Sequence, residues 1–156
     1  MKKSQKKIKF LFVSKWGEIL DIAYAVQKEG NEVKLYIEDS PCREIGIGFV
    51  PKARDWKKHI QWADVIIFDY TGWGKEATEL RLAGKYVIGG SEYTDKLEVD
   101  RSFGQDQLKK HKVKILGYKE FTSYKDAIEY VKHNPNTYVL KPSGAMQDYN
   151  QLRSVR

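Results

Sequence analysis

Lys141 is the side chain best placed for chemistry in this sequence. It ends the apolar segment YVLK and leads into a Pro-Ser-Gly turn at residues 142–144. A lysine at the end of a predicted strand can lie partly enclosed beside a ligand, where its ammonium group neutralises phosphate oxygens as a compact point charge. Such a lysine can equally extend its ammonium group into water. The residues around it leave both interpretations open.

Glycine-rich turns after the predicted strands form a second group of candidates. Gly17 lies in the turn SKWGE, Gly72 lies in TGWG, and Ser91 follows a pair of glycines. Open α/β sheets bind ligands beyond the carboxyl ends of their strands, where glycine lets a phosphate approach backbone N–H groups. We therefore expect substrate contacts at Gly17, Gly72 and Ser91, although a turn that needs positive φ explains the glycines more simply. The patterns G-x-G-x-x-G and G-x-x-x-x-G-K-[ST] are absent from the sequence, which argues against a nicotinamide dinucleotide site and excludes a standard P-loop.

Histidine, cysteine and aspartate side chains form no catalytic or metal motif. The three histidines have no metal-ligand spacing, and the single Cys42 excludes an internal disulfide and a multi-cysteine metal site. We interpret Cys42 as an incidental thiol, since no activating base is evident beside it. Asp69 ends the run DVIIFD, but Ser14 and Lys15 stand where a phosphoacceptor would need further carboxylates.

An alternation of strands and helices positions these residues. Short apolar runs predict buried strands, and apolar residues at helical spacing predict helices. The predicted strands cover residues 7–14, 32–37, 64–69 and 85–88, and the predicted helices cover residues 18–29, 54–62 and 75–82. Strand, helix and strand within about 30 residues form a βαβ unit with parallel strands. We expect an α/β fold with a mostly parallel sheet, in which the strand at 64–69 is central.

The pattern changes after residue 93. A long polar helix is predicted over 94–111, a short strand over 114–116, a helix from Ser123 with the capping-box spacing Ser123-x-x-Asp126, and a last strand over 138–141. This succession opens a second unit whose closing strands are missing. We therefore divide the chain into a basic tail (1–9), an α/β domain (7–93), and a linking helix with an incomplete second unit (94–156).

The net charge of +7 is concentrated near the N-terminus. Five lysines lie within the first nine residues, and no acidic residue precedes Glu18. The remaining 23 basic side chains nearly balance 21 acidic ones. A near-neutral body with a basic tail does not resemble a nucleic-acid recognition face. No apolar run approaches the roughly 18 residues of a membrane-spanning helix. With its single cysteine, the sequence predicts a cytoplasmic protein that acts on small molecules.

The succession of motifs from Gly84 to Gly144 resembles the phosphoribosylamine–glycine ligases and, more broadly, the ATP-grasp superfamily. The segments GKYVIGGSEYTDKLEVDRSFGQDQL, YKEFTSYKDAIEYV and YVLKPSG match the order and spacing of the family pattern. The residues before Gly84 are consistent with the family only as a pre-ATP-grasp α/β domain. The resemblance implies a Rossmann-like pre-ATP-grasp domain followed by the start of an ATP-grasp subdomain.

This resemblance assigns a nucleotide site. Lys141 corresponds to the strand-end lysine that contacts ATP in the family, and Ser143 and Gly144 lie in the turn after it. Arg101 stands where the family has a helix lysine near the nucleotide phosphates, and a guanidinium can bind a phosphate through two hydrogen bonds.

The sequence departs from the family at two places. Gln105 replaces a second lysine of the family helix, and Lys15 and Trp16 occupy the place of a Gly-Gly-Arg-Glu-His loop near the family's substrate. The resemblance therefore implies nucleotide binding more strongly than it implies the identity of the amine substrate.

The reaction implied by the resemblance is ATP-dependent amide formation in purine biosynthesis. ATP phosphorylates the carboxylate of glycine, and phosphoribosylamine attacks the acyl phosphate to give glycinamide ribonucleotide. Magnesium is implied as well, but its family ligands lie downstream of the matching segment, so we expect no catalysis by this chain alone. Two alternatives stay open. One is the acceptor-binding half of a two-domain glycosyltransferase, which residues 9–37 resemble, and the other is a non-catalytic nucleotide- or substrate-binding module.

Deletion of residues 1–6 tests the interpretation of the lysine-rich segment as a solvated extension. Exposed charges contribute little to stability, so thermal unfolding should be nearly unchanged. A loss of more than about 1 kcal/mol in the free energy of unfolding would show that this segment packs on the body.

Overall fold

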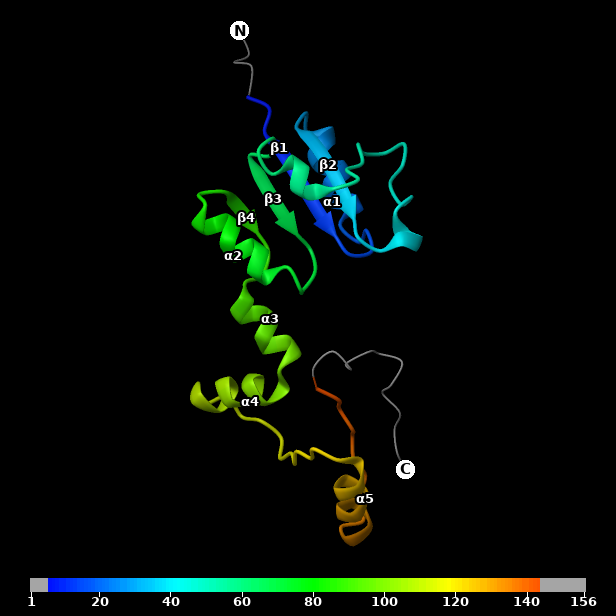
Figure 1. The fold of residues 1–156 in the computed structure, drawn as a ribbon, viewed down its shortest axis with the longest axis vertical. Helices are drawn as coiled ribbons and strands as arrows, with labels where there is room; N and C mark the ends of the chain where they lie inside the picture. The colour runs from blue at the N-terminus through cyan, green and yellow to red at the C-terminus, as the bar shows by residue number, and fades with distance from the viewer. Residues whose placement is uncertain (1–5, 144–156) are drawn as a thin grey trace. The chain divides into compact units, whose positions relative to one another are not determined.

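The structure is a computed structural model that describes residues 6–143 of the chain. The chain divides into two compact units, Met1–Asp95 and Lys96–Arg156. The first unit contains a four-stranded parallel sheet in the order β2-β1-β3-β4 (Figure 1). Its strands are β1 (Lys9–Ser14), β2 (Glu32–Ile37), β3 (Val65–Phe68) and β4 (Tyr86–Ile88). The sheet confirms the predicted α/β class and the interior place of the strand at 64–69.

The two central strands, β1 and β3, are apolar on both sides because both faces of the sheet are covered there. In β1, Leu11 and Val13 belong to a buried cluster that includes residues of helix α2 (Gly74–Leu82). Phe12 points to the opposite face, into a second cluster that includes residues of helix α1 (Leu20–Lys28). Successive side chains of β1 therefore pack into apolar clusters on opposite faces of the sheet.

The strand order places a topological switch point between β1 and β3. The connection from β1 leads to β2 on one side, whereas β3 pairs with β1 on the other side and leads on to β4. At such a switch in strand order, the loops that follow the two central strands diverge and leave room for a ligand at the carboxyl edge. In this protein those loops begin at Ser14 and at Asp69.

Two predicted helices differ from the structure. The prediction of an α-helix over 54–62 was wrong, since the structure forms 3-10 helix η2 (Trp56–His59) after another short 3-10 helix, η1 (Ser40–Cys42). The long helix predicted over 94–111 is two helices, α3 (Glu92–Val99) and α4 (Arg101–Lys110). Asp100 separates them because its backbone is extended and its carboxylate accepts the N–H of Phe103 at 2.9 Å, which is the geometry of a helix N-cap.

The second unit has helices but no strand ladder among its described residues. Helix α5 (Tyr124–His133) begins as predicted, with the hydroxyl of Ser123 accepting the N–H of Asp126 at 3.2 Å. The strands predicted over 114–116 and 138–141 were wrong for the described part of the chain, where Tyr138 makes only an isolated bridge. A strand needs a neighbour to pair its backbone groups. Within residues 96–143 no such neighbour forms, and no side chain is fully enclosed.

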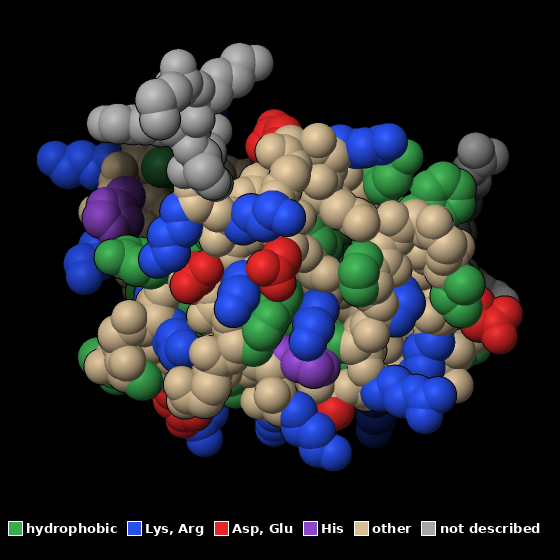
Figure 2. Space-filling model, turned by 90° about the horizontal axis from the view of Figure 1, so that it is seen from above, with side chains coloured by type: hydrophobic (Ala, Val, Ile, Leu, Met, Phe, Trp, Pro, Cys, Tyr) green, Lys and Arg blue, Asp and Glu red, His purple; other side chains and the backbone are tan. Residues whose placement is uncertain are grey.

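Basic side chains are dispersed over the surface. Figure 2 shows lysine and arginine side chains separated by apolar and acidic ones on the visible face. Among residues 6–143, no helix has the length and apolar character needed to cross a membrane.

Truncation of Ile66 tests the two-faced core. Ile66 in β3 is fully buried, whereas Ile88 at the edge of the sheet is 60% exposed. Ile66→Ala should lower the free energy of unfolding by about 2–5 kcal/mol, and the matched Ile88→Ala should change it far less. Urea unfolding measures both, and equal losses would contradict the assignment of β3 to the core.

Candidate functional site

A hydrogen-bonded serine and aspartate join the two central strands at the carboxyl edge of the sheet. Ser14 ends β1 and is fully buried, and Asp69 directly follows β3. The hydroxyl of Ser14 donates to Oδ2 of Asp69 at 2.6 Å and accepts the N–H of Gly17 at 2.7 Å. One hydroxyl therefore ties together both loops at the switch in strand order.

Burial makes the charge of Asp69 costly. Desolvation raises the pKa of Asp69, and the nearby carboxylate of Glu18 raises it further. The hydroxyl of Ser14 and the backbone N–H groups of Lys15 and Asp69 oppose this rise. Oδ1 of Asp69 is enclosed and accepts no hydrogen bond of good geometry from the described residues. A carboxylate in this situation is a candidate for a functional group.

Aromatic rings and a lysine lie on the same two loops. The rings of Trp16 and Tyr70 meet edge to face, with 4.7 Å between their centroids. The ammonium group of Lys15 lies 4.6 Å from the centroid of each ring, a distance at which a cation is attracted by an aromatic face. Lys15 and Trp16 occupy the turn where the sequence resemblance implies a Gly-Gly-Arg-Glu-His loop near the substrate.

A second carboxylate joins the loops after β3 and β4. Oδ2 of Asp95 accepts the N–H of Gly72 at 3.1 Å and the N–H of Gly74 at 2.7 Å. Gly74 allows no side chain, because a Cβ there would lie 2.2 Å from the carbonyl oxygen of Ser91. The N–H of Ser91 donates to Oγ1 of Thr94 at 2.7 Å. The structure thus brings together the predicted residues Gly72 and Ser91.

Arg81 fixes the loop that carries Ser91. Its guanidinium donates to the carbonyl oxygens of Gly90 at 2.7 Å and Gly89 at 2.8 Å, with a longer contact to Val87. Gly89 has a φ of +144°, and a Cβ at this position would lie 3.0 Å from Phe68 in the neighbouring strand. Arg81 therefore positions the loop after β4 and does not face a ligand through these nitrogens.

The amides of the three predicted substrate-binding residues are already engaged. The N–H of Gly17 bonds to Ser14, that of Gly72 bonds to Asp95, and that of Ser91 bonds to a threonine hydroxyl. The predicted contact of these residues with a substrate remains a prediction. The sequence analysis missed Ser14, Asp69 and Asp95 as the residues that organise this edge. The partners of Asp95 lie 21 and 23 residues away, a separation that leaves no local pattern.

Cys42 gains no nucleophilic character from its surroundings. The carboxylate of Asp39 accepts a hydrogen bond from the thiol and is the largest cause of a raised pKa of Cys42. A raised pKa disfavours the reactive thiolate.

In the second unit, Arg101 lies against the turn that carries Lys141. Nε of Arg101 donates to the carbonyl oxygen of Pro142 at 2.8 Å, and the backbone N–H of Arg101 donates to Oγ of Ser143 at 3.3 Å. Lys141 itself is exposed. The fold therefore brings Arg101 beside Pro142 and Ser143, about 40 residues further along the chain, in the turn that follows Lys141. Gly144, the fourth predicted nucleotide contact, lies outside the described residues.

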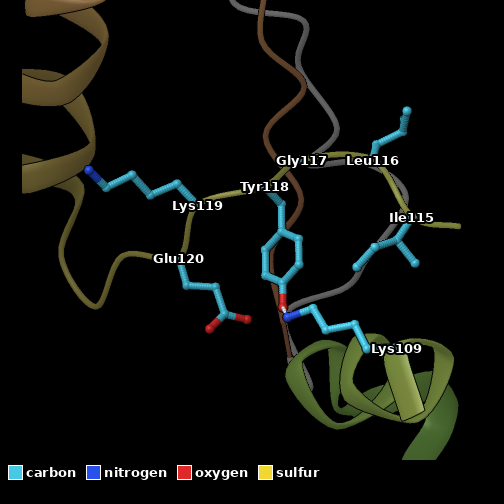
Figure 3. Close-up of a pocket in the computed structure, with 7 residues that line it drawn as sticks. All are labelled: Lys109, Ile115, Leu116, Gly117, Tyr118, Lys119 and Glu120. Atoms are coloured by element: carbon cyan, nitrogen blue, oxygen red, sulfur yellow. Dashed lines mark hydrogen bonds between the residues drawn. The ribbon is translucent and has the colours of Figure 1, made fainter. Parts of the chain in front are cut away.

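A shallow pocket in the same unit is lined by residues of α4 and of the extended segment after it. Figure 3 shows its lining, which consists of Lys109 and residues 115–120. The ammonium group of Lys109 donates to the hydroxyl of Tyr118 at 2.9 Å, which raises the pKa of Lys109. Glu120 accepts a hydrogen bond from the hydroxyl of Ser102, next to Arg101. The polar groups of this pocket mainly hold the extended segment against α4.

The described residues do not fit a magnesium site. No group of three or more histidine, cysteine, aspartate or glutamate side chains comes together within residues 6–143. We therefore assign no metal ligand to this part of the chain.

The α/β fold of this chain is similar to that of solved ribonucleotide synthetases. The fold is similar to N5-carboxyaminoimidazole ribonucleotide synthetase from Thermotoga maritima, with a TM-score of 0.61, 16% identity, and coverage of 88% of this chain and 39% of that chain. It is also similar to N5-carboxyaminoimidazole synthetase from Staphylococcus aureus complexed with ADP, with a TM-score of 0.65, 15% identity, and coverage of 92% and 40%.

Two curated relatives are purine biosynthetic proteins. The chain is 33% identical over 67 residues to the bifunctional purine biosynthetic protein PUR2,5 of Pichia angusta, covering 43% of this chain and 8% of that protein. It is 23% identical over 153 residues to the trifunctional purine biosynthetic protein adenosine-3 of Chironomus tentans, covering 87% and 11%. The chain thus spans about a tenth of the length of these relatives. No family model matches it. These similarities confirm the resemblance to the purine-biosynthetic ligases of the ATP-grasp superfamily.

The raised pKa of Asp69 predicts how stability depends on pH. The folded state binds this proton more tightly than the unfolded state, whose pKa lies near 3.8. The protonated carboxyl therefore contributes stability at low pH, and this contribution is lost as pH rises through the raised folded pKa. Asp69→Asn removes the charge but keeps an oxygen that can accept from Ser14. Relative to the wild type, the free energy of unfolding of this variant should increase as pH rises from the unfolded pKa of 3.8 through the raised pKa of the folded state.

Urea unfolding from pH 4 to 7 measures this difference. The exposed Glu44→Gln serves as the control for the loss of one negative charge. A difference between Asp69→Asn and wild type that stays constant with pH would contradict the buried, costly carboxylate.

Proposed function

We propose that this chain is the N-terminal part of an ATP-dependent carboxylate–amine ligase of purine biosynthesis, resembling phosphoribosylamine–glycine ligase. In this proposal, the substrate binds at the carboxyl edge of the sheet in the first unit. The second unit contributes Arg101, Lys141 and Ser143 to the binding of the nucleotide phosphates. The similarity to purine biosynthetic proteins, and to a synthetase whose structure was solved with ADP, supports this proposal.

The observation that carries the proposal is the contact of Arg101 with the turn after Lys141. Residues assigned to ATP by two separate motifs lie beside each other, through the hydrogen bonds from Arg101 to Pro142 and Ser143. Both side chains are cations. Arg101 is the first residue of α4, and Lys141 directly precedes the turn that Arg101 contacts. Guanidinium and ammonium groups both suit phosphate oxygens.

The proposed reaction proceeds through an acyl phosphate. A carboxylate oxygen of the acid forms a bond to the γ-phosphorus of ATP, and the bond from this phosphorus to the leaving oxygen of ADP breaks. The ammonium form of the amine first loses a proton, and its lone pair then attacks the acyl carbon. Inorganic phosphate leaves, and the nitrogen loses a second proton to give the amide. In this scheme Arg101 and Lys141 hold the phosphate oxygens and offset their negative charge. Magnesium, which the family implies, would be bound by residues outside the described part.

The comparisons favour the ligase over the glycosyltransferase alternative, because the synthetase fold extends over most of the chain, second unit included. A nucleotide-binding module without catalysis would use the same residues. The proposed partners are ATP and small-molecule substrates, and the proposed place of action is the cytoplasm.

Titration with ADP tests the nucleotide site. Lys141→Ala should weaken ADP binding by about 1.5–3 kcal/mol, the range of a hydrogen bond to a charged group. Calorimetry or NMR titration of the full chain measures the affinity. Lys125→Ala, an exposed lysine on α5 of the same unit, is the matched control and should bind ADP like the wild type. An absence of ADP binding, or equal affinity in all three proteins, would contradict the proposal.

A further inference from the structure

The carboxyl edge of the sheet offers few backbone donors to an anion. The amides of Gly17, Gly72, Gly74 and Ser91 point to oxygens of the protein itself, at distances between 2.7 and 3.1 Å. A phosphate bound at these turns would have to displace a serine hydroxyl, the carboxylate of Asp95 or a threonine hydroxyl. The structure therefore argues against a phosphate cradle made by these amides.

An unused acceptor lies at the same edge. Oδ2 of Asp69 accepts from Ser14, whereas Oδ1 is enclosed and accepts no hydrogen bond of good geometry from the described residues. The backbone N–H groups of Lys15 and Asp69 are close enough to lower the pKa of the carboxyl, but they do not fully satisfy it. A buried polar atom without a partner is rare in folded proteins and calls for an explanation. It lies at the switch point between β1 and β3, the edge at which sheets of this kind bind ligands.

The charges around Asp69 are not balanced by a nearby cation. None of the ion pairs among the described residues includes Asp69 or Glu18, and Glu18 is close enough to act on the carboxylate of Asp69. The ammonium group of Lys15 lies over the rings of Trp16 and Tyr70. The unpaired acceptor thus lies in a negative environment, which attracts a cationic hydrogen-bond donor.

We propose that Asp69 binds the protonated amino group of the amine substrate, with Oδ1 accepting its hydrogen bond and Ser14 holding the carboxylate in place. The substrate role rests on the proposed ligase function, whereas the binding of an amine does not. Because Oδ1 is enclosed, an amine reaches it by shifting the loops that begin at Ser14 and Asp69. The edge therefore selects the amine by its positive charge, and a phosphate or a neutral sugar is not held at this position.

A matched pair of ligands tests the inference. 1-Amino-1-deoxyribitol carries an ammonium group at neutral pH, and ribitol is its uncharged counterpart. Backbone amide NMR spectra of the full chain are recorded while each compound, and separately inorganic phosphate, is added. We expect saturable shifts at residues 15–17 and 70–72 with the amine, and no saturable shift with ribitol or phosphate at the same concentrations.

Asp69→Asn removes the negative charge but keeps the size of the side chain. Its amide oxygen can still accept the hydrogen bond from Ser14. The affinity for the amine should fall roughly tenfold or more, as expected for loss of a charged hydrogen bond. Glu44→Gln, an exposed carboxylate, should bind the amine like the wild type. Equal binding of amine and ribitol, unchanged amine affinity in Asp69→Asn, or saturable phosphate shifts at Gly17 and Gly72 would each overturn the inference.

The comparison of amine with ribitol needs only the wild-type protein, so a misfolded variant does not prevent the test. No nucleotide is present in these titrations. A failed ADP titration would overturn the proposed function alone, whereas a failed amine titration would overturn the role of Asp69 alone.

Discussion

The hydrogen bond from Ser14 to Asp69 is the interaction on which the carboxyl edge of this sheet depends. It joins the ends of β1 and β3, whose connections leave in different directions, and the same hydroxyl holds the amide of Gly17. A hydroxyl that donates to one group and accepts from another fixes both loops with a single buried side chain. The other oxygen of this carboxylate, Oδ1, is enclosed, and burial raises the pKa of Asp69.

The carboxylate of Asp95 accepts hydrogen bonds from loop amides of the kind that bind anionic ligands in other α/β proteins. Asp95 engages the amides of Gly72 and Gly74 at the start of α2, where the helix dipole favours a negative group. An internal carboxylate bonded in this way does the work of a bound anion. The edge is consequently rich in acceptors, and its preference is expected to be for ligands that donate hydrogen bonds.

The two units differ in what holds them together. The first unit has two apolar clusters on the faces of its sheet, so its loops are anchored on a packed core. In the second unit, caps and polar contacts define the local structure, as at Asp100 and Ser123. The contact of Arg101 with residues 142 and 143 is of the same kind, a few directed hydrogen bonds between distant segments.

The sequence alone determined the strands, the crossover helices and the cap at Ser123, because alternation, helical spacing and capping act over a few residues. It also indicated Arg101 and Lys141 through the order of motifs. The tertiary structure decided that Asp100 divides a helix, that segments 114–116 and 138–141 form no ladder among the described residues, and which acceptors engage the turn amides. Asp69 and Asp95 act on partners more than 20 residues away, and hydrogen bonds over such separations exist only once the chain has folded.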